Sequence, residues 1–439
     1  MTQIQTSSPA ESHGPVTPRG SSYKWWVVFM LWFVCFFNYA DRQAIYSVFP
    51  RLQEEFGFDK SQLGLIGSAF MWVYALCAPL AGVVGDRVER KKLILGGCLF
   101  WSFVTVTTGW CGRLWQFVMV RALEGFGETF YFPASVSLTS DYHDRSTRSR
   151  ALSFHQSSVY VGTIAGSWVG AWLAMHYDWR LGFYIFGGVG MVLALVLWRC
   201  LLEPRRGQSE SPAAAACQER LPLGQTLRLV FQRPTALLLM AAFFGANLVA
   251  MVFLTWTTTF LIEKFKFELA TAGLVGILLI NVASAVSVAV AGTLADRMAR
   301  RFPGGRILVQ ATGLLVGAGF VALVGRATDT ATLLAAMAAF GFCKGFYDSG
   351  IFASLYDVIE PRARATAAGF MNTVGWAGGA TGTMGFGWLA MHGRYASEVE
   401  NMSDALVLGG AVYLVAAAIL FATVLLFVRR DLTRYQQAA

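Results

Sequence analysis

Charged residues are scarce in this chain. Asp, Glu, Lys and Arg together make up 14% of its 439 residues, whereas hydrophobic residues make up 55%, and the mean hydropathy is +0.51. A soluble protein of this composition would lack the polar residues that cover a water-exposed surface. The composition therefore excludes an ordinary soluble domain and indicates a membrane protein.

Histidine and cysteine are also rare. The five histidines are scattered, and none of the seven cysteines forms a Cys-x-x-Cys pair. Metal sites usually need several such residues at short spacing, and nucleotide sites need a glycine-rich loop that is missing here. We therefore predict no metal, no cofactor and no enzymatic site, and we interpret the cysteines as small buried hydrophobic residues.

Long apolar stretches dominate the chain. A helix that crosses a membrane needs about 20 mostly apolar residues. Twelve such stretches are found, so we predict an all-α membrane protein with twelve transmembrane helices. They cover approximately 25–50, 62–86, 93–112, 115–140, 149–174, 181–201, 235–262, 270–295, 306–326, 331–357, 365–391 and 404–428.

The chain contains an internal repeat. The pentapeptide Trp-Leu-Ala-Met-His occurs at 172–176 and again at 388–392, 216 residues later. A second motif, Gly-x-x-x-Asp-Arg, occurs at 82–87 and at 292–297. A repeated half in a membrane protein is typical of transporters whose substrate site lies between the halves.

The basic residues predict the topology. Of the 35 Lys and Arg residues, 24 fall in segments on the side of the chain ends, 8 on the opposite side and 3 inside helices. The positive-inside rule then places both ends in the cytoplasm, and we expect no nucleic-acid partner. The expected segments are a disordered cytoplasmic tail (1–22), a six-helix bundle (23–202), a cytoplasmic linker (203–234), a second six-helix bundle (235–430) and a short cytoplasmic tail (431–439).

Two loops and one helix carry a family resemblance. Residues 82–92 read Gly-Val-Val-Gly-Asp-Arg-Val-Glu-Arg-Lys-Lys, with a weaker copy at 292–301, and residues 121–127 read Arg-Ala-Leu-Glu-Gly-Phe-Gly. These motifs resemble those of the major facilitator superfamily. The resemblance implies two pseudo-symmetric six-helix bundles around a central cavity and secondary active transport by alternating access.

Two shorter stretches resemble two groups within that superfamily. Residues 38–42 contain the pair Asp41-Arg42, and residues 125–128 end in Glu128. Both the organic anion:cation symporters and the spinster-type lysolipid transporters are similar to this chain in these features. The resemblance does not choose between the two groups.

Several charged residues lie inside predicted helices, where each costs about 2.5–3.5 kcal/mol even on a lenient insertion scale. We interpret Arg42 as a contact to a substrate carboxylate and Asp41 and Glu128 as proton-coupling residues. Lys344 is the repeat equivalent of Glu128 and gives the cavity a second cation, unless it only pairs with Asp348 four residues later. The alternative for the others is likewise a structural ion pair.

Polar residues elsewhere complete the candidate sites, although each could instead be an interhelical hydrogen-bonding residue. The further expected substrate contacts are Tyr39, Tyr131, Gln156, Asn247, Trp256, Tyr347 and Asn372. The loop motifs predict a breakable conformational latch made by Asp86, Arg87, Arg90, Asp296 and Arg297.

Together these patterns predict a proton-coupled transporter of the plasma membrane that imports a small organic anion such as a sugar acid. The alternative is a spinster-like carrier of lysolipid or another amphiphile. The expected partners are the anionic substrate, protons and the lipid bilayer, and we expect a monomer.

Overall fold

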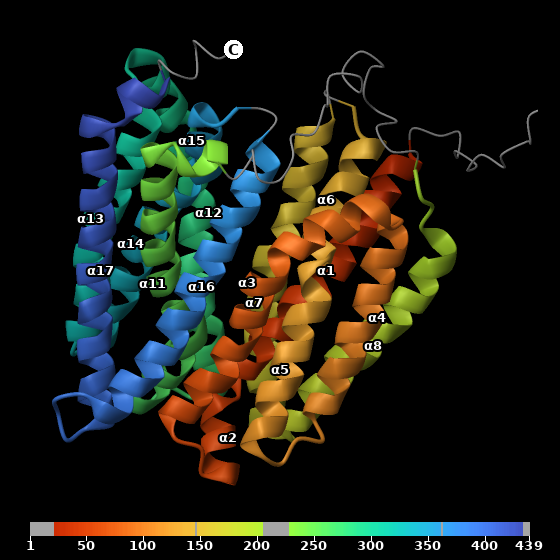
Figure 1. The fold of residues 1–439 in the computed structure, drawn as a ribbon. Helices are drawn as coiled ribbons and strands as arrows, with labels where there is room; N and C mark the ends of the chain where they lie inside the picture. The colour runs from red at the N-terminus through yellow and green to blue at the C-terminus, as the bar shows by residue number, and fades with distance from the viewer. Residues whose placement is uncertain (1–21, 145–146, 205–227, 361–362, 433–439) are drawn as a thin grey trace, which may run out of the picture.

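The structure is a computed structural model that describes residues 22–144, 147–204, 228–360 and 363–432. The described residues are mostly helical, in the all-α fold that the apolar stretches predict (Figure 1). The predicted tail at 1–22, most of the linker at 203–234 and most of the tail at 431–439 lie outside them.

The first half of the chain forms one bundle of six spans. A short helix, α2 (Phe49–Phe56), follows the first span, and the fourth span is broken into two helices. Pro133 explains the break, because a proline ring clashes with the carbonyl group four residues earlier, here that of Thr129. The spans are α1 (Tyr23–Ser47), α3 (Lys60–Arg87), α4 (Arg90–Thr108), α5 (Leu114–Thr129) with α6 (Tyr131–Tyr142), α7 (Arg148–His176) and α8 (Trp179–Cys200).

The second half repeats this arrangement, including a break in its fourth span. In the described part of the chain, eight of the twelve spans are long and apolar enough to be recognised by hydropathy alone. The other four (α1, α4, α5 with α6, and α16) carry charges or many Gly and Thr residues. The spans of the second bundle are α11 (Pro234–Phe265), α12 (Leu269–Arg301), α13 (Gly305–Arg326), α14 (Thr330–Asp348) with α15 (Ile351–Val358), α16 (Arg364–His392) and α17 (Glu398–Leu426).

Glycines allow equivalent helix pairs to approach closely in both bundles. A Cβ atom added to Gly166 of α7 would lie 2.1 Å from the carbonyl oxygen of Ala40 in α1. One added to Gly382 of α16 would lie 2.4 Å from the carbonyl oxygen of Leu248 in α11. Because small residues let backbones touch, this spacing fixes α1 against α7 and α11 against α16.

The two bundles lie side by side and converge at one end (Figure 1). We call the end where α1 begins and α17 finishes the terminal face, and the end that carries α2 the far face. The contacts between the bundles lie toward the far face: Gln43 donates to the carbonyl oxygen of Leu254 at 2.7 Å, and Ser167 donates to that of Gly273 at 2.8 Å. Lys60 of α3 also pairs with Glu263 of α11 at 3.1 Å.

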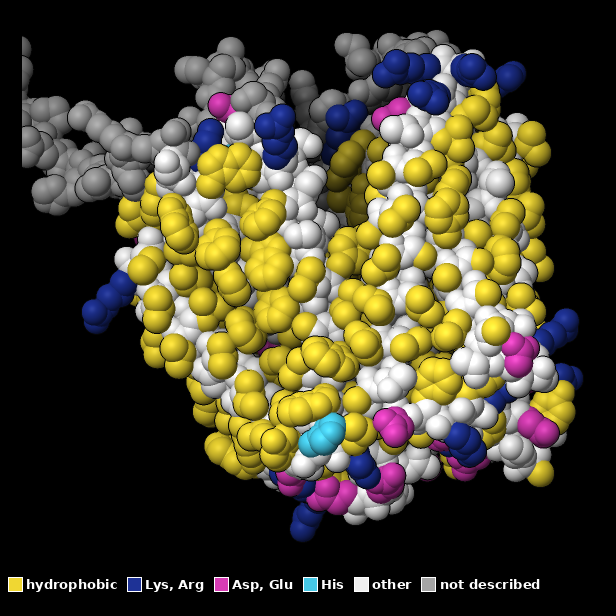
Figure 2. Space-filling view, turned by 180° about the vertical axis from the view of Figure 1, so that it is seen from behind, with side chains coloured by type: hydrophobic (Ala, Val, Ile, Leu, Met, Phe, Trp, Pro, Cys, Tyr) yellow, Lys and Arg dark blue, Asp and Glu magenta, His cyan; other side chains and the backbone are white. Residues whose placement is uncertain are grey.

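The outer surface fits a bilayer. Hydrophobic side chains form a broad band across both bundles, and most charged side chains gather at the two ends (Figure 2). Exposed residues such as Leu76, Val192 and Leu425 belong to this lipid-facing surface, with 71%, 61% and 81% of their areas exposed. An apolar band of this kind is stable only against lipid hydrocarbon.

Candidate functional site

A cavity of about 430 Å³ lies between the bundles. Helices α1, α7, α11, α12, α14, α15 and α16 contribute to its wall, mostly through residues in their middle turns or nearer the terminal face. Because the bundles meet toward the far face, the cavity opens toward the terminal face. The lining residues include seven of the nine expected substrate contacts: Tyr39, Arg42, Gln156, Asn247, Lys344, Tyr347 and Asn372.

The other two expected contacts, Tyr131 and Trp256, do not line this cavity. The Tyr131 hydroxyl donates to the carbonyl oxygen of Leu31 at 2.9 Å, inside the first bundle. The Trp256 indole N–H donates to the carbonyl oxygen of Thr383 at 3.0 Å, inside the second. Their polar atoms already have partners within the protein, so we leave both residues out of the site proposed below.

Arg42 is the cation that α1 presents to the cavity. Its Nε donates to Glu128 Oε2 at 2.9 Å, and its Nη2 donates to the same oxygen and to Asn38 at 3.2 Å. Among the described residues, Nη1 has no hydrogen-bond partner, and it is not fully enclosed. One side of the guanidinium group is therefore free to bind a ligand.

Aromatic rings hold this guanidinium group in place. The Tyr39, Phe70 and Trp376 rings have their centroids 4.4, 4.6 and 5.4 Å from Arg42 Cζ. Trp376 belongs to α16 and also contacts Tyr74 of α3 at 4.6 Å between centroids, so the two bundles meet at this point. Cation–π contacts of this kind restrict the orientation of Arg42.

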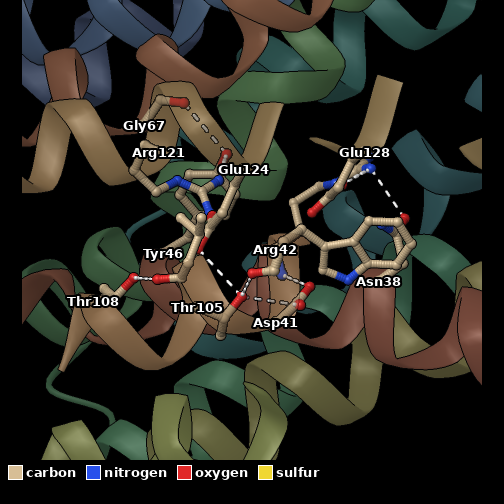
Figure 3. Close-up of polar contacts among 12 residues, drawn as sticks. Asn38, Asp41, Arg42, Tyr46, Gly67, Thr105, Thr108, Arg121, Glu124 and Glu128 are labelled. Carbon is tan, nitrogen blue, oxygen red and sulfur yellow. Dashed lines mark hydrogen bonds and ion pairs between the residues drawn. The ribbon is translucent and has the colours of Figure 1, made fainter. Parts of the chain in front are cut away.

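Buried carboxyl groups surround Arg42 (Figure 3). Glu128 is 1% exposed, and its second oxygen, Oε1, has no partner among the described residues. Asp41 is 2% exposed and accepts hydrogen bonds from the Arg42 backbone N–H at 2.7 Å and from the Thr105 hydroxyl at 3.2 Å. The carboxyl group of Asp41 thus has polar partners but no listed ion pair in the described part of the chain.

The charges of this cluster do not balance. Its three carboxyl groups belong to Asp41, Glu124 and Glu128, while its two guanidinium groups belong to Arg42 and Arg121, and all five residues are buried. Arg42 pairs with Glu128 and Arg121 with Glu124. Because an unpaired buried charge costs several kcal/mol, the cluster is most stable when one carboxyl group carries a proton.

The second bundle contributes a separate ion pair. Lys344 pairs with Asp348 one turn later on α14, and both residues line the cavity. Their side chains are 23% and 34% exposed, so this pair is much better solvated than the Arg42–Glu128 pair. The cavity therefore presents one cation from each bundle, and each cation has a carboxylate beside it.

The predicted latch residues lie at the terminal face. The side chains of Asp86 and Arg87 are outside the described residues, and Arg297 is exposed. Arg90 pairs with Asp141 and with Glu203, the latter at 2.9 Å.

The second bundle repeats the Arg90–Asp141 pair. Arg306 pairs with Asp357 at 2.5 Å, and both residues lie 216 positions after their counterparts. Arg306 also donates to Asp296 at 2.8 Å. The pairs described here at the terminal face each lie within one bundle, so they brace that bundle around a broken span.

Several residues at the site were not among the sequence-based candidates. Gln43, Asn281 and Trp376 line the cavity, and Thr105 lies beside Asp41. Trp376 could have been found from the repeat, because Tyr160, another cavity residue, lies 216 positions before it. Thr105 carries no such signal, since threonines in apolar helices are common.

Comparisons with known proteins agree with this geometry. The family model of the Major Facilitator Superfamily matches residues 31–383. The probable anion transporter 4 of rice chloroplasts (Oryza sativa subsp. japonica) is 29% identical over 409 residues, which cover 89% of this chain and 68% of that protein. The probable galactarate/D-glucarate transporter of Bacillus subtilis (strain 168) is 25% identical over 387 residues, covering 82% and 84% of the two chains.

A solved structure has the same fold. The crystal structure of a bacterial homolog of the human lysosomal transporter spinster, in an inward-facing and unoccupied conformation, superposes with a TM-score of 0.81. The superposition covers 95% of this chain and 99% of that one at 21% sequence identity. With a family match that spans most of its length and this fold, the chain belongs to the Major Facilitator Superfamily and is a multi-pass membrane transporter.

Proposed function

We propose that this protein imports a small organic anion, of the sugar-acid class, together with protons. The observation that carries the proposal is the buried Arg42–Glu128 pair at the cavity wall, with Arg42 Nη1 free. A guanidinium group in this setting suits a carboxylate ligand. The names of the relatives, an anion transporter and a galactarate/D-glucarate transporter, support an anionic substrate.

Competition for Arg42 couples the substrate to a proton. Glu128 and a substrate carboxylate both require the same guanidinium group, and two carboxylates close together repel each other. Protonation of Glu128 removes its charge, and Arg42 then becomes available to the substrate. Substrate binding therefore takes up a proton, so the affinity rises as the pH falls.

Lys344 gives a second contact from the opposite bundle. Lys344 and Arg42 line the same cavity, and the ammonium group of Lys344 has hydrogens beyond the one that Asp348 accepts. A diacid can therefore engage one cation in each bundle. Because both bundles then hold the substrate, its binding favours the closure that alternating access requires. Gln156, Asn247 and Asn372 supply hydrogen bonds to its hydroxyl groups.

The terminal face is cytoplasmic in this proposal, and the membrane is the plasma membrane. The excess of Lys and Arg on that side supports the orientation. The cavity then faces inward, and transport requires the far-face contacts to open while the terminal face closes. Asp86 and Arg87, with Arg90, Asp296 and Arg297, form the latch that closes the terminal face.

A ligand panel tests the substrate class. We expect D-glucarate to raise the melting temperature of the purified protein, and to do so more at mildly acidic than at mildly alkaline pH. At a concentration of about 100 times Kd, a ligand stabilises the protein by about 2.7 kcal/mol. D-Glucitol, which has the same carbon skeleton without carboxyl groups, is the control. Stabilisation by lysophosphatidylcholine but not by sugar acids would instead support the amphiphile carrier.

Lys60 provides a prediction about the closed far face. It is 1% exposed and pairs across the bundles with Glu263 and Glu398. Replacing Lys60 with glutamine removes both pairs from the inward-open state only, and each 1.4 kcal/mol lost shifts a two-state population tenfold. We therefore expect the bundles to separate at the far face, as a longer distance between spin labels at Glu54 and Thr328.

The matched control for Lys60 is Arg394→Gln. Arg394 lies in the turn between α16 and α17, where it pairs with Asp404 at 2.8 Å within the second bundle. Removing this pair should leave the label distance unchanged. An unchanged distance in Lys60→Gln as well would show that the Lys60 pairs do not hold the far face closed.

A further inference from the structure

The hydroxyl group of Thr105 lies between two buried carboxyl groups (Figure 3). Its oxygen is 3.2 Å from Asp41 Oδ2 on α1 and 3.4 Å from Glu124 Oε1 on α5. It is also 2.9 Å from the backbone carbonyl oxygen of Trp101, one turn earlier on α4. One side chain of α4 thus connects titratable groups of two other helices.

The hydrogens at this point can be counted. A threonine hydroxyl has one hydrogen to donate and two lone pairs to accept with. Three acceptor oxygens surround it, so with both carboxyl groups ionised at least two of these contacts would lack a hydrogen. A proton on Asp41 or Glu124 supplies the missing hydrogen, because that carboxyl group then donates to the Thr105 oxygen. The same cluster already has one carboxyl group more than it has guanidinium groups.

The charged groups around the pair give the proton two sites of similar character. Asp41 accepts from the Arg42 backbone N–H, and Glu124 pairs with Arg121, so each carboxyl group has a stabilising partner when ionised. Their distance along the helices differs: Asp41 adjoins the cavity residue Arg42, whereas Glu124 lies one turn nearer the far face than Glu128. The other ionisable groups of the cluster are Glu128 of α5, Tyr46 of α1, and Cys98 and Cys111 of α4.

We propose that Thr105 is a positioning residue that holds one proton between Asp41 and Glu124 and lets it pass between them. The Asp41 O–H bond breaks as the proton joins the Thr105 oxygen, while the Thr105 hydrogen leaves for Glu124 Oε1. The threonine ends as it began, and one proton has moved with no net charge left on it. The reverse transfer carries a proton from the far-face side toward the cavity. This inference rests on the proposed proton coupling.

Infrared spectroscopy tests the shared proton without any substrate. The purified protein in lipid nanodiscs should show the C=O stretching band of a protonated, hydrogen-bonded carboxyl group, which Asp41→Asn alters. Thr105→Val keeps the side-chain shape but removes the hydroxyl, and it should shift this band to higher frequency. Thr105→Ser keeps the hydroxyl and should restore the wild-type band. An identical band in Thr105→Val and wild type would overturn the proposal.

A second variant makes the test independent of how Thr105→Val folds. Glu124→Gln leaves Thr105 intact but removes one of the two proton sites, so a shared proton predicts a changed Asp41 band. A band unaffected by Glu124→Gln would also contradict the proposal.

Transport measurements separate this inference from the proposed function. In proteoliposomes, Thr105→Val should lose at least about tenfold in proton-driven D-glucarate uptake, whereas exchange of D-glucarate without a gradient should stay within about twofold, and Thr105→Ser should recover both. Equal loss of both processes in Thr105→Val would mean a merely structural role. If wild-type protein does not transport D-glucarate, the proposed substrate class fails, and the infrared result still decides on Thr105.

Discussion

Replacing Arg42 with alanine is expected to abolish D-glucarate uptake and to weaken D-glucarate binding at least about 30-fold. The loss of one partner from a buried, hydrogen-bonded charge pair costs about 2–5 kcal/mol, and 1.4 kcal/mol corresponds to tenfold in Kd. The variant removes the only cation that α1 contributes to the described cavity wall. Binding by purified protein, measured by isothermal titration calorimetry, checks the prediction apart from any effect on transport.

The fold of the Arg42→Ala variant should survive. Glu128 loses its ion pair, but a buried carboxyl group without a cation can take up a proton and remain neutral. Arg42→Lys should bind with intermediate affinity, because an ammonium group keeps the charge but not the planar fork of donors. Arg180→Ala is the matched control: it removes a guanidinium group that pairs with Glu55 at 2.6 Å on the far face, away from the cavity. Near-normal affinity in folded Arg42→Ala would sink the assigned contact.

Much of the fold follows from the sequence by simple physics. Apolar stretches of sufficient length predict the helices, and the repeated Gly166 and Gly382 predict where pairs of helices touch. The repeat at 216 residues also relates the Arg90–Asp141 pair to the Arg306–Asp357 pair. Patterns of this kind are visible because they depend on residue type and spacing alone.

The wall of the cavity could be predicted only in part. Tyr131 and Tyr347 are repeat equivalents, yet Tyr347 lines the cavity and Tyr131 bonds to Leu31 inside the first bundle. The spacing also differs between helix pairs: the contacts of Gly166 and Gly382 relate Ala40 to Leu248, which are 208 residues apart. Loops of unequal length shift one span against another, and only the folded structure shows the result.

The pairing of charges could not be read from the sequence either. The sequence predicts that Arg42, Asp41 and Glu128 are buried, but Asp41 adjoins Arg42 in the chain while Glu128 is its ion-pair partner. Successive helical side chains point about 100° apart, so neighbours need not bond through their side chains. The position of Thr105 between two carboxyl groups depends on how α4 packs against α1 and α5, which no local pattern encodes.

Replacing Glu128 with glutamine is expected to separate substrate movement from proton movement. Glutamine has nearly the shape of a protonated glutamate but cannot release a proton. Arg42 should then be free for the substrate at every pH, so D-glucarate binding should persist and lose its pH dependence. Accumulation of D-glucarate driven by a proton gradient should fall to the level of passive equilibration.

Lys344→Gln is the matched comparison for Glu128→Gln. The two residues are repeat equivalents, and Lys344 pairs with the solvated Asp348. Its loss should weaken D-glucarate binding, because a cation leaves the cavity, while the remaining uptake stays coupled to protons. If both variants kept wild-type coupling, Glu128 would serve only as a structural partner of Arg42.

The pH inside proteoliposomes tests proton coupling through Glu128 most directly. With a pH-sensitive dye trapped inside, external D-glucarate should acidify the lumen of vesicles that contain wild-type protein, and D-glucitol should not. Glu128→Gln vesicles should exchange labelled D-glucarate across the membrane without acidification. Acidification by Glu128→Gln at the wild-type rate, or D-glucarate uptake by wild-type protein without any acidification, would contradict the proposed coupling.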